Sequence, residues 1–151
     1  SDGDGADGDL AASVRAADAL ATEGLEAMDS AVRGARWGGP SSTLERCGGD
    51  FDIASYSVNG SLLAADATDS AVVAAWEEAG LDVDTGGDDP TVSRDGATMT
   101  FTAGPDGSDA GWFQVRVDCT RADGDVIDEL RTSAPKDLGQ ELGLRQDPMF
   151  D

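Results

Sequence analysis

The first part of the chain carries apolar residues at helical spacing. Steps of three and four separate Leu10, Val14, Ala17, Ala21, Leu25, Met28 and Val32. This spacing places them on one face, so we predict an amphipathic helix from Asp9, a suitable N-cap, to about Arg36. The Gly-Gly-Pro run at 38–40 then ends it. Gly24 lies mid-helix and costs about 1 kcal/mol relative to Ala, which indicates a kink or a close packing contact.

The middle of the chain predicts one strand and one further helix. Residues 51–58 alternate in a strand pattern, although neither face is cleanly apolar, and Asn59-Gly60 follows as a strong turn signal. Residues 66–79 have a helical pattern whose candidate N-caps are Asp66, Thr68 and Asp69. The predicted buried stripe of this helix is Ala71, Val72, Ala75, Trp76 and Ala79.

Strand patterns dominate the following part of the chain. Residues 91–94 and 97–103 are predicted to form a hairpin around the turn signal Asp95-Gly96. In the segment 112–119, alternation directs Phe113, Val115, Val117 and Cys119 toward the core. The opposite face of this strand carries Trp112, Gln114, Arg116 and Asp118. A short helix is predicted over 125–132.

These elements predict a two-layer α+β domain. About two main helices pack on one face of a roughly four-stranded antiparallel sheet. The other face is rich in Thr and Arg and is expected to meet solvent or a partner. Residues 1–8 have nothing to bury and are predicted to be a disordered Asp/Gly-rich tether. The single domain is expected over 9–133, followed by an irregular C-terminal tail over 134–151.

Composition excludes several classes of function. The 151 residues include 31 acidic and 10 basic side chains, a formal net charge of -21, and such a surface repels phosphate backbones. No nucleic-acid partner is therefore expected. Because the sequence has no histidine, it lacks Ser-His-Asp and Cys-His catalysis and the commonest metal ligand. Neither a nucleotide-binding glycine motif nor a CxxC pair occurs, so we expect no enzyme, no cofactor and no metal site.

The cysteines and the basic residues bear on the compartment. Cys47 and Cys119 are the two cysteines of the chain, and an even pair in a small domain indicates a disulfide. The alternative is two buried thiols, because free cysteine is among the most buried residue types. A single lysine among the 10 basic residues fits a GC-rich genome. Two settings remain open: the surface of a high-GC bacterium, and the cytoplasm of a salt-accumulating halophile.

Several features together resemble a known group of proteins. They are the Asp/Gly-rich leader, a long helix ending in Arg36-Trp37, a cysteine before the first strand, the segment AVVAAWEEAGLDV, strands joined by Asp-Gly, and a second cysteine ending WFQVRVDC. In layout, over most of the chain, they are similar to the small mature lipoproteins of actinobacterial cell envelopes, including the mycobacterial LppA-like group. The resemblance implies a non-enzymatic protein held on the outer face of the cytoplasmic membrane by an upstream lipidated cysteine.

The candidate binding surface is the outward face of the strand at 112–119. Trp112, Gln114 and Arg116 share this face, and an exposed indole gives a large contact area at low entropy cost. The preferred function is a monomeric envelope binding module for an unknown protein or cell-wall component. Two alternatives remain. One is a small acidic inhibitor or immunity-type protein that binds a basic partner, and the other is a halophilic cytoplasmic domain.

Overall fold

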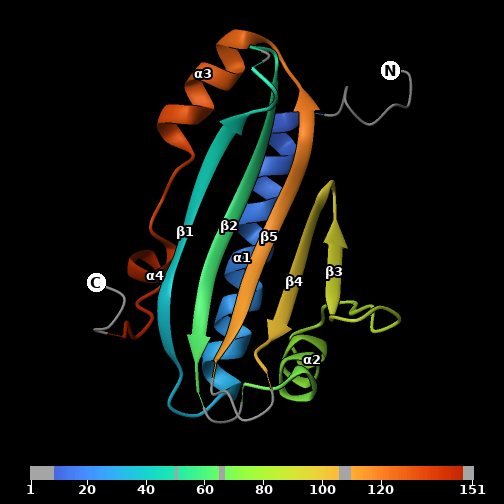
Figure 1. Ribbon diagram of the computed structural model, residues 1–151, viewed down its shortest axis with the longest axis vertical. Coiled ribbons are helices and arrows are strands. Elements are labelled where there is room, and N and C mark those ends of the chain that lie inside the picture. Colours follow the sequence, from blue (N-terminus) through green and yellow to red (C-terminus); the bar gives the residue numbers. More distant parts are fainter. Residues whose placement is uncertain (1–8, 50, 65–66, 106–109, 148–151) are drawn as a thin grey trace.

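The computed structural model describes residues 9–49, 51–64, 67–105 and 110–147 (Figure 1). In chain order its elements are α1 (Leu10–Ala31), β1 (Arg36–Arg46), β2 (Ile53–Leu63), α2 (Asp69–Glu78), β3 (Thr91–Arg94), β4 (Ala97–Ala103), β5 (Ala110–Arg121), α3 (Gly124–Ser133) and α4 (Leu138–Glu141). The strands form one antiparallel sheet in the order β1-β2-β5-β4-β3. The tether predicted over residues 1–8 lies outside the described residues.

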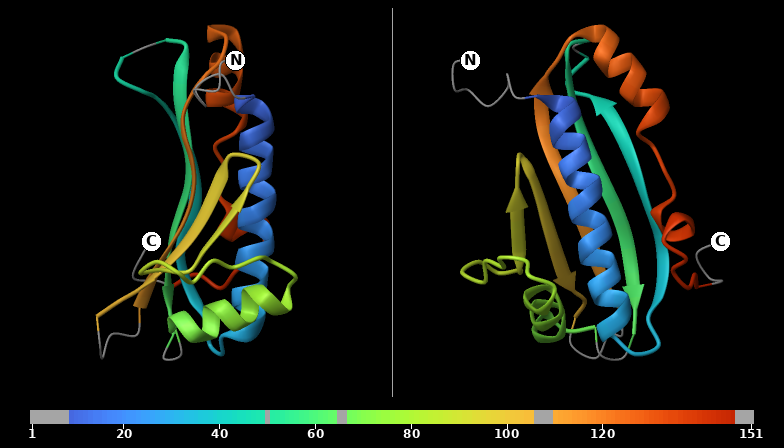
Figure 2. Two further views of the ribbon diagram at one scale, coloured as in Figure 1. Left: turned by 90° about the vertical axis from the view of Figure 1, so that its right-hand side faces the viewer. Right: turned by 180° about the vertical axis from the view of Figure 1, so that it is seen from behind.

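The architecture is α+β in two layers, as the sequence predicts. α1 crosses one face of the sheet and packs on β2, β5 and β4, while α2 packs beside it against β4 (Figure 2). α3 and α4 lie along β1, at the edge of the sheet (Figure 1). The predicted counts need correction, because the described part of the chain has five strands and four helices rather than about four and two.

One face of α1 supplies a large share of the core. Asp9 caps the helix as predicted, because its carboxylate accepts a hydrogen bond of 3.1 Å from the Ala12 N–H. Close packing explains the glycine in mid-helix. The indole Nε1 of Trp76 donates to the Gly24 carbonyl at 3.2 Å, and a Cβ at Gly24 would overlap the thioether of Met99. The other buried residues of this face are Leu10, Val14, Ala17, Leu20, Ala21, Leu25 and Met28.

β1 occupies the segment that the sequence predicts to end the first helix. The strand passes through the Gly-Gly-Pro run by means of a bulge, since its pairing with β2 skips from Gly38 to Ser41. Gly39 has a φ of 79°, a left-handed conformation that glycine adopts without steric cost. A proline is tolerated at such a bulge because no ladder hydrogen bond is required of it. Trp37 is therefore a strand residue, and its side chain is fully buried.

β2 continues through Asn59-Gly60, where the sequence predicts a turn. Gly60 is needed for a different reason: a Cβ there would lie 2.7 Å from the Cβ of Pro40 on the neighbouring strand. The glycine thus marks a close approach of two strands rather than a reversal of the chain. The predicted turn is wrong, and the strand is five residues longer than the predicted 51–58 at its C-terminal end.

The C-terminal segment, defined here as residues 134–147, packs against β1. The Ser42 N–H donates to the Lys136 carbonyl at 3.0 Å, and the Ser42 hydroxyl donates to the Ala134 carbonyl at 3.2 Å. The segment contains α4 within the region predicted to be irregular, and it buries Leu138 and Leu144. It therefore covers the edge of β1, a position that would otherwise offer free backbone groups to another strand.

A polar network joins the C-terminal segment to the core. The ammonium of Lys136 lies 3.0 Å from one carboxylate oxygen of Asp18 in α1, and the hydroxyl of Tyr56 in β2 donates to the other at 2.5 Å. Burial, followed by the hydrogen bond to Asp18, raises the pKa of the Tyr56 phenol far above its ordinary value. Three parts of the chain that are distant in sequence thus meet at one carboxylate.

The predicted disulfide is present, with an S–S distance of 2.04 Å between Cys47 and Cys119. Cys119 does not face the core, however. At Ser55 the register between β2 and β5 shifts, so that Asp118 and Cys119 stand opposite this one residue. The extra residue of this bulge reverses the alternation, leaving Cys119 exposed and Thr120 buried.

Candidate functional site

The sheet face opposite α1 is polar and faces the viewer in Figure 1. No helix of the described chain covers it. The strands curve, so that this open face is concave (Figure 2). Strand register sets its outward side chains in rows that run across β1, β2, β5 and β4. The first row is Gly38, Ser61, Trp112 and Thr102; the second is Ser41, Asn59, Gln114 and Thr100; the third is Thr43, Ser57, Arg116 and Thr98.

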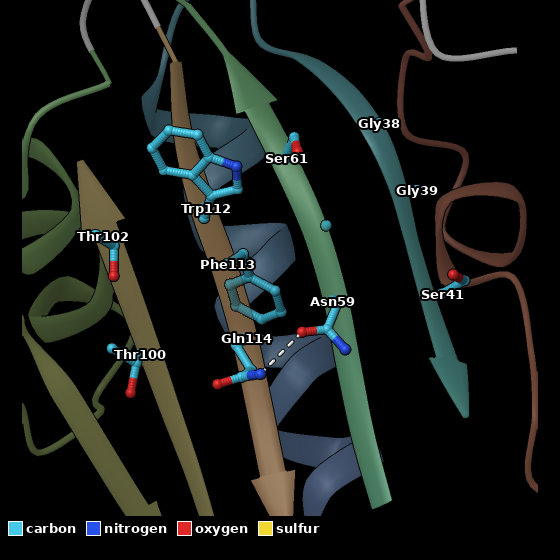
Figure 3. Close-up of a pocket in the computed structure, with 11 residues that line it drawn as sticks. Gly38, Gly39, Ser41, Asn59, Ser61, Thr100, Thr102, Trp112, Phe113 and Gln114 are labelled. Atoms are coloured by element: carbon cyan, nitrogen blue, oxygen red, sulfur yellow. Dashed lines mark hydrogen bonds between the residues drawn. The ribbon is translucent and has the colours of Figure 1, made fainter. Parts of the chain in front are cut away.

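The first two rows line an open hollow of about 500 Å³ (Figure 3). This volume lies within the roughly 300–1,000 Å³ of small-molecule sites. The hollow is on the open face and not between the layers, so it leaves the core intact. The described residues that line it are Gly38, Gly39, Ser41, Asn59, Gly60, Ser61, Thr100, Thr102, Trp112, Phe113 and Gln114.

Trp112 is the one large aromatic side chain that the hollow exposes. Its side chain is 50% exposed, whereas Trp37 and Trp76 are fully buried in the core and Phe113 is also buried. Figure 3 shows the indole over β5, with small hydroxyl side chains on the neighbouring strands. An indole face left in water forgoes the free energy of burial, so the half-exposed Trp112 is the candidate contact residue of the hollow.

Hydrogen bonds hold the amide side chains of the hollow in place. The Gln114 amide donates to the Asn59 side-chain oxygen at 3.0 Å, and the Asn59 amide donates to the Ser57 hydroxyl at 3.0 Å. By contrast, the hydroxyls of Ser41, Ser61 and Thr100 have no hydrogen-bond partner in the part of the chain that the structure describes. Each such hydroxyl offers one donor and two acceptor positions to a ligand.

The structure brings two of the three predicted site residues together. Trp112 and Gln114 lie in the hollow, in adjacent rows of β5. Arg116 lies in the third row, just outside the hollow, and its guanidinium is 2.8 Å from the carboxylate of Asp118 on the same strand. Both members of this ion pair are more than half exposed, so the pair adds little to stability.

The residues that β1 and β2 contribute to the hollow could not be predicted. Gly38 and Ser41 fall where the sequence predicts the end of a helix, and Asn59 and Ser61 fall where it predicts a turn. The threonines of β4 were recognisable, because Thr100 and other threonines alternate with apolar residues in a clear strand pattern. These residues join the hollow only because β1 and β2 pair with each other and with β5, and a local sequence pattern does not show which strands pair.

The described lining of the hollow carries no charged side chain. One carboxylate reaches the lining through a hydrogen bond, because the Thr102 hydroxyl donates to Asp89 at 2.9 Å. Within residues 9–49, 51–64, 67–105 and 110–147, no group of three metal-ligating side chains is gathered closely enough to hold an ion. In the same residues, no helix has both the length and the apolar character to cross a membrane.

No protein-family model, curated protein sequence or solved structure matches this chain. The fold and the hollow are therefore the observations on which a function has to be based.

Proposed function

We propose that this protein is a non-enzymatic binding module of a bacterial cell envelope, which takes a cell-wall component or an envelope protein in the hollow of its open sheet face. The observation that carries the proposal is the half-exposed indole of Trp112 in a concave, otherwise polar hollow. Aromatic anchors of this kind dominate the energetics of contact surfaces, and neighbouring polar groups orient the ligand.

The proposed location is the outer face of the cytoplasmic membrane. A disulfide persists in oxidising compartments and is rare in the cytosol, and the bond between Cys47 and Cys119 supports a location outside the cytoplasm. The likeness in layout to small actinobacterial envelope lipoproteins supports attachment by a lipid carried on an upstream cysteine. The protein is proposed to act as a monomer, because the outer edge of β1 is covered by its own C-terminal segment.

The uncharged lining of the hollow supports a binding role over catalysis. General acid-base chemistry needs a titratable side chain within hydrogen-bond reach of the reacting atoms. The sequence has no histidine, and the described lining of the hollow offers hydroxyls, amides and one indole. Thr102 is the described lining residue whose hydroxyl donates to a carboxylate, that of Asp89 at 2.9 Å, and the other lining hydroxyls, without a neighbouring base, are weak nucleophiles at neutral pH. This set of groups is suited to recognition.

Co-sedimentation with cell-wall material tests the proposal. Fluorescently labelled protein is mixed with isolated envelopes of a high-GC Gram-positive bacterium, and the bound fraction is measured against protein concentration. We expect Trp112→Ala to lose most of the bound fraction. Thr98→Ala is the matched control, because Thr98 is exposed on the same face in the third row, outside the hollow. Equal binding of the wild type and Trp112→Ala would contradict the proposal.

A second candidate function is a small acidic inhibitor of a basic protein, which the formal net charge of -21 favours. Such a complex would form by electrostatic steering, so its association rate would fall steeply as salt rises. Binding through the neutral hollow would depend weakly on salt. Repeating the sedimentation at low and high ionic strength therefore separates the two candidates, and Trp112→Ala would leave the electrostatic complex intact.

A further inference from the structure

The charge of the hollow differs sharply from the charge of the whole molecule. The chain has 31 acidic residues, yet every described residue that lines the hollow is neutral. The charged groups closest to the lining are already engaged, because Asp89 accepts a hydrogen bond of 2.9 Å from the Thr102 hydroxyl and Arg116, in the adjacent row, is paired with Asp118 at 2.8 Å. An anionic ligand would in addition be repelled by the rest of the surface. Charge complementarity therefore selects an uncharged ligand.

The polar groups of the hollow match a ligand that carries hydroxyls. The lining residues Ser41, Ser61 and Thr100 have hydroxyls without a hydrogen-bond partner in the described chain, and each can donate one hydrogen bond and accept others. The amides of Asn59 and Gln114 are held together by a hydrogen bond of 3.0 Å, which fixes their orientation before a ligand arrives. Groups that both donate and accept are complementary to the hydroxyls of a sugar, which have the same dual character.

The indole supplies the remaining part of the match. A pyranose ring has a face of C–H groups as well as a rim of hydroxyls, so it can stack on an aromatic face while its hydroxyls bond to surrounding polar groups. Trp112 is flanked across the strands by Ser61 and Thr102. These side chains are too short to cover the indole face.

A peptide fits this surface less well. Extended peptides gain most of their affinity by hydrogen-bonding the free backbone edge of a strand. The hollow lies on the face of the sheet, where β2 and β5 are paired on both sides, so their backbone groups are used within the sheet. The ligand must therefore be recognised by side chains alone.

We propose that the hollow binds a neutral glycan chain, with one sugar ring stacked on Trp112 and its hydroxyls bonded to the free hydroxyls and fixed amides of the first two rows. This inference rests on the proposed function and specifies its ligand class. The row across β1, β2, β5 and β4 spans roughly 14 Å, so a short oligosaccharide lying across the strands fills the hollow.

Tryptophan fluorescence provides a direct test, because Trp112 is exposed and the other two tryptophans are fully buried. Acrylamide, an uncharged quencher, will quench chiefly Trp112. The probes are chitohexaose, dextran, mannan and arabinogalactan as neutral glycans, and polygalacturonate as a charged glycan. We expect at least one neutral glycan to protect the indole from acrylamide, and polygalacturonate to give no protection.

Calorimetric titration of the protecting glycan against variants then locates the binding. We expect Trp112→Ala to weaken the affinity by about tenfold or more, the loss typical of a central aromatic contact, and Trp112→Phe to restore part of it. Thr98→Ala should bind as the wild type does. Circular dichroism melting of each variant establishes that the fold is retained, which is expected because Trp112 lies outside the core.

The outcomes separate the ligand class from the broader function. Unchanged affinity in Trp112→Ala would overturn the glycan inference, because the sugar would then bind elsewhere. If no neutral glycan protects the indole while Trp112→Ala still loses envelope binding, the glycan inference is wrong and the proposed function stands. If neither glycans nor envelopes bind through Trp112, both are wrong.

Discussion

Replacing Cys47 and Cys119 together by alanine removes the covalent cross-link of the fold and should lower its stability considerably. The bond ties the chain after β1 to the end of β5, across a sequence separation of 72 residues. The native state loses little, because Cys119 is exposed and Cys47 is only partly buried, so the alanines leave no large cavity. The expected effect therefore arises in the unfolded state, which gains freedom when the loop is opened.

The size of the effect follows from the length of the closed loop. For a loop of this size the chain-entropy relation gives about 4 kcal/mol of stabilisation at room temperature. A domain of about 150 residues changes its melting temperature by roughly 2–4 °C per kcal/mol. The double variant should therefore melt about 8–16 °C lower than the oxidised protein, and its urea m-value should rise because its unfolded chain exposes more surface.

Equilibrium unfolding in urea, followed by circular dichroism, measures both quantities. Three samples are compared: oxidised wild type, wild type with reductant, and Cys47→Ala/Cys119→Ala with reductant. The last two should coincide, and reductant should leave the double variant unchanged. Thiol titration of the denatured, unreduced wild type should find no free cysteine, as the bond requires. A loss of less than about 1 kcal/mol on reduction would refute the argument from loop entropy.

Two further predictions concern the core and the C-terminal segment. Gly139→Ala should lower the free energy of unfolding by about 1–3 kcal/mol in a urea titration, because the new Cβ would overlap the Gly39 carbonyl of β1. The control is Gly87→Ala, since a Cβ at Gly87 meets no atom within 4 Å. Equal stability of the two variants would contradict the contact between Gly139 and β1. Tyr56 is the one tyrosine of the chain, and burial together with the Asp18 hydrogen bond raises its pKa. The stability that its neutral phenol contributes is therefore present below pH of about 10, the ordinary pKa of tyrosine, and is lost as the pH rises above it. Tyrosinate absorbance should appear only together with alkaline unfolding, and a reversible midpoint near pH 10 in the folded protein would be the contrary result.

The elements that the sequence predicts well are those that depend on neighbouring residues. The β3-β4 hairpin is an example: Asp95 and Gly96 adopt φ values of 49° and 90°, the left-handed pair that an Asp-Gly turn supplies. The helical pattern of α2 likewise contains the buried Trp76, although Thr68 rather than Asp69 provides the cap. Asp66, another candidate cap, lies outside the described residues.

The elements that the sequence does not predict depend on distant partners. The Gly-Gly-Pro run forms a bulge in β1, and Gly60 on the adjacent strand leaves the room that Pro40 needs there. β1 is further held by two hydrogen bonds to the C-terminal segment, more than 90 residues away in sequence: the Ser42 hydroxyl donates to the Ala134 carbonyl and accepts from the Lys136 N–H. No local pattern contains these contacts.

The candidate site divides in the same way. Alternation along β5 correctly turns Trp112 and Gln114 toward the open face, and it fails at Cys119 because the bulge beside Ser55 shifts the phase. The placement of Arg116 outside the hollow depends on the register with β2 and β4, which alternation cannot supply. The sequence alone thus identifies one strand that lines the hollow, but it does not predict how deep the hollow is or how many strands line it.

Lys136, the single lysine of the chain, makes the docking of the C-terminal segment chemically observable. An acylating reagent has to reach the side-chain nitrogen of Lys136, which lies 3.0 Å from the Asp18 carboxylate on a side chain that is 31% exposed while the segment is docked. Acylation of this side chain is therefore slower in the docked state than after the segment has separated from α1. Because no second lysine adds to the signal, the labelling rate at this one position gives a kinetic measure of how often the edge of β1 is uncovered.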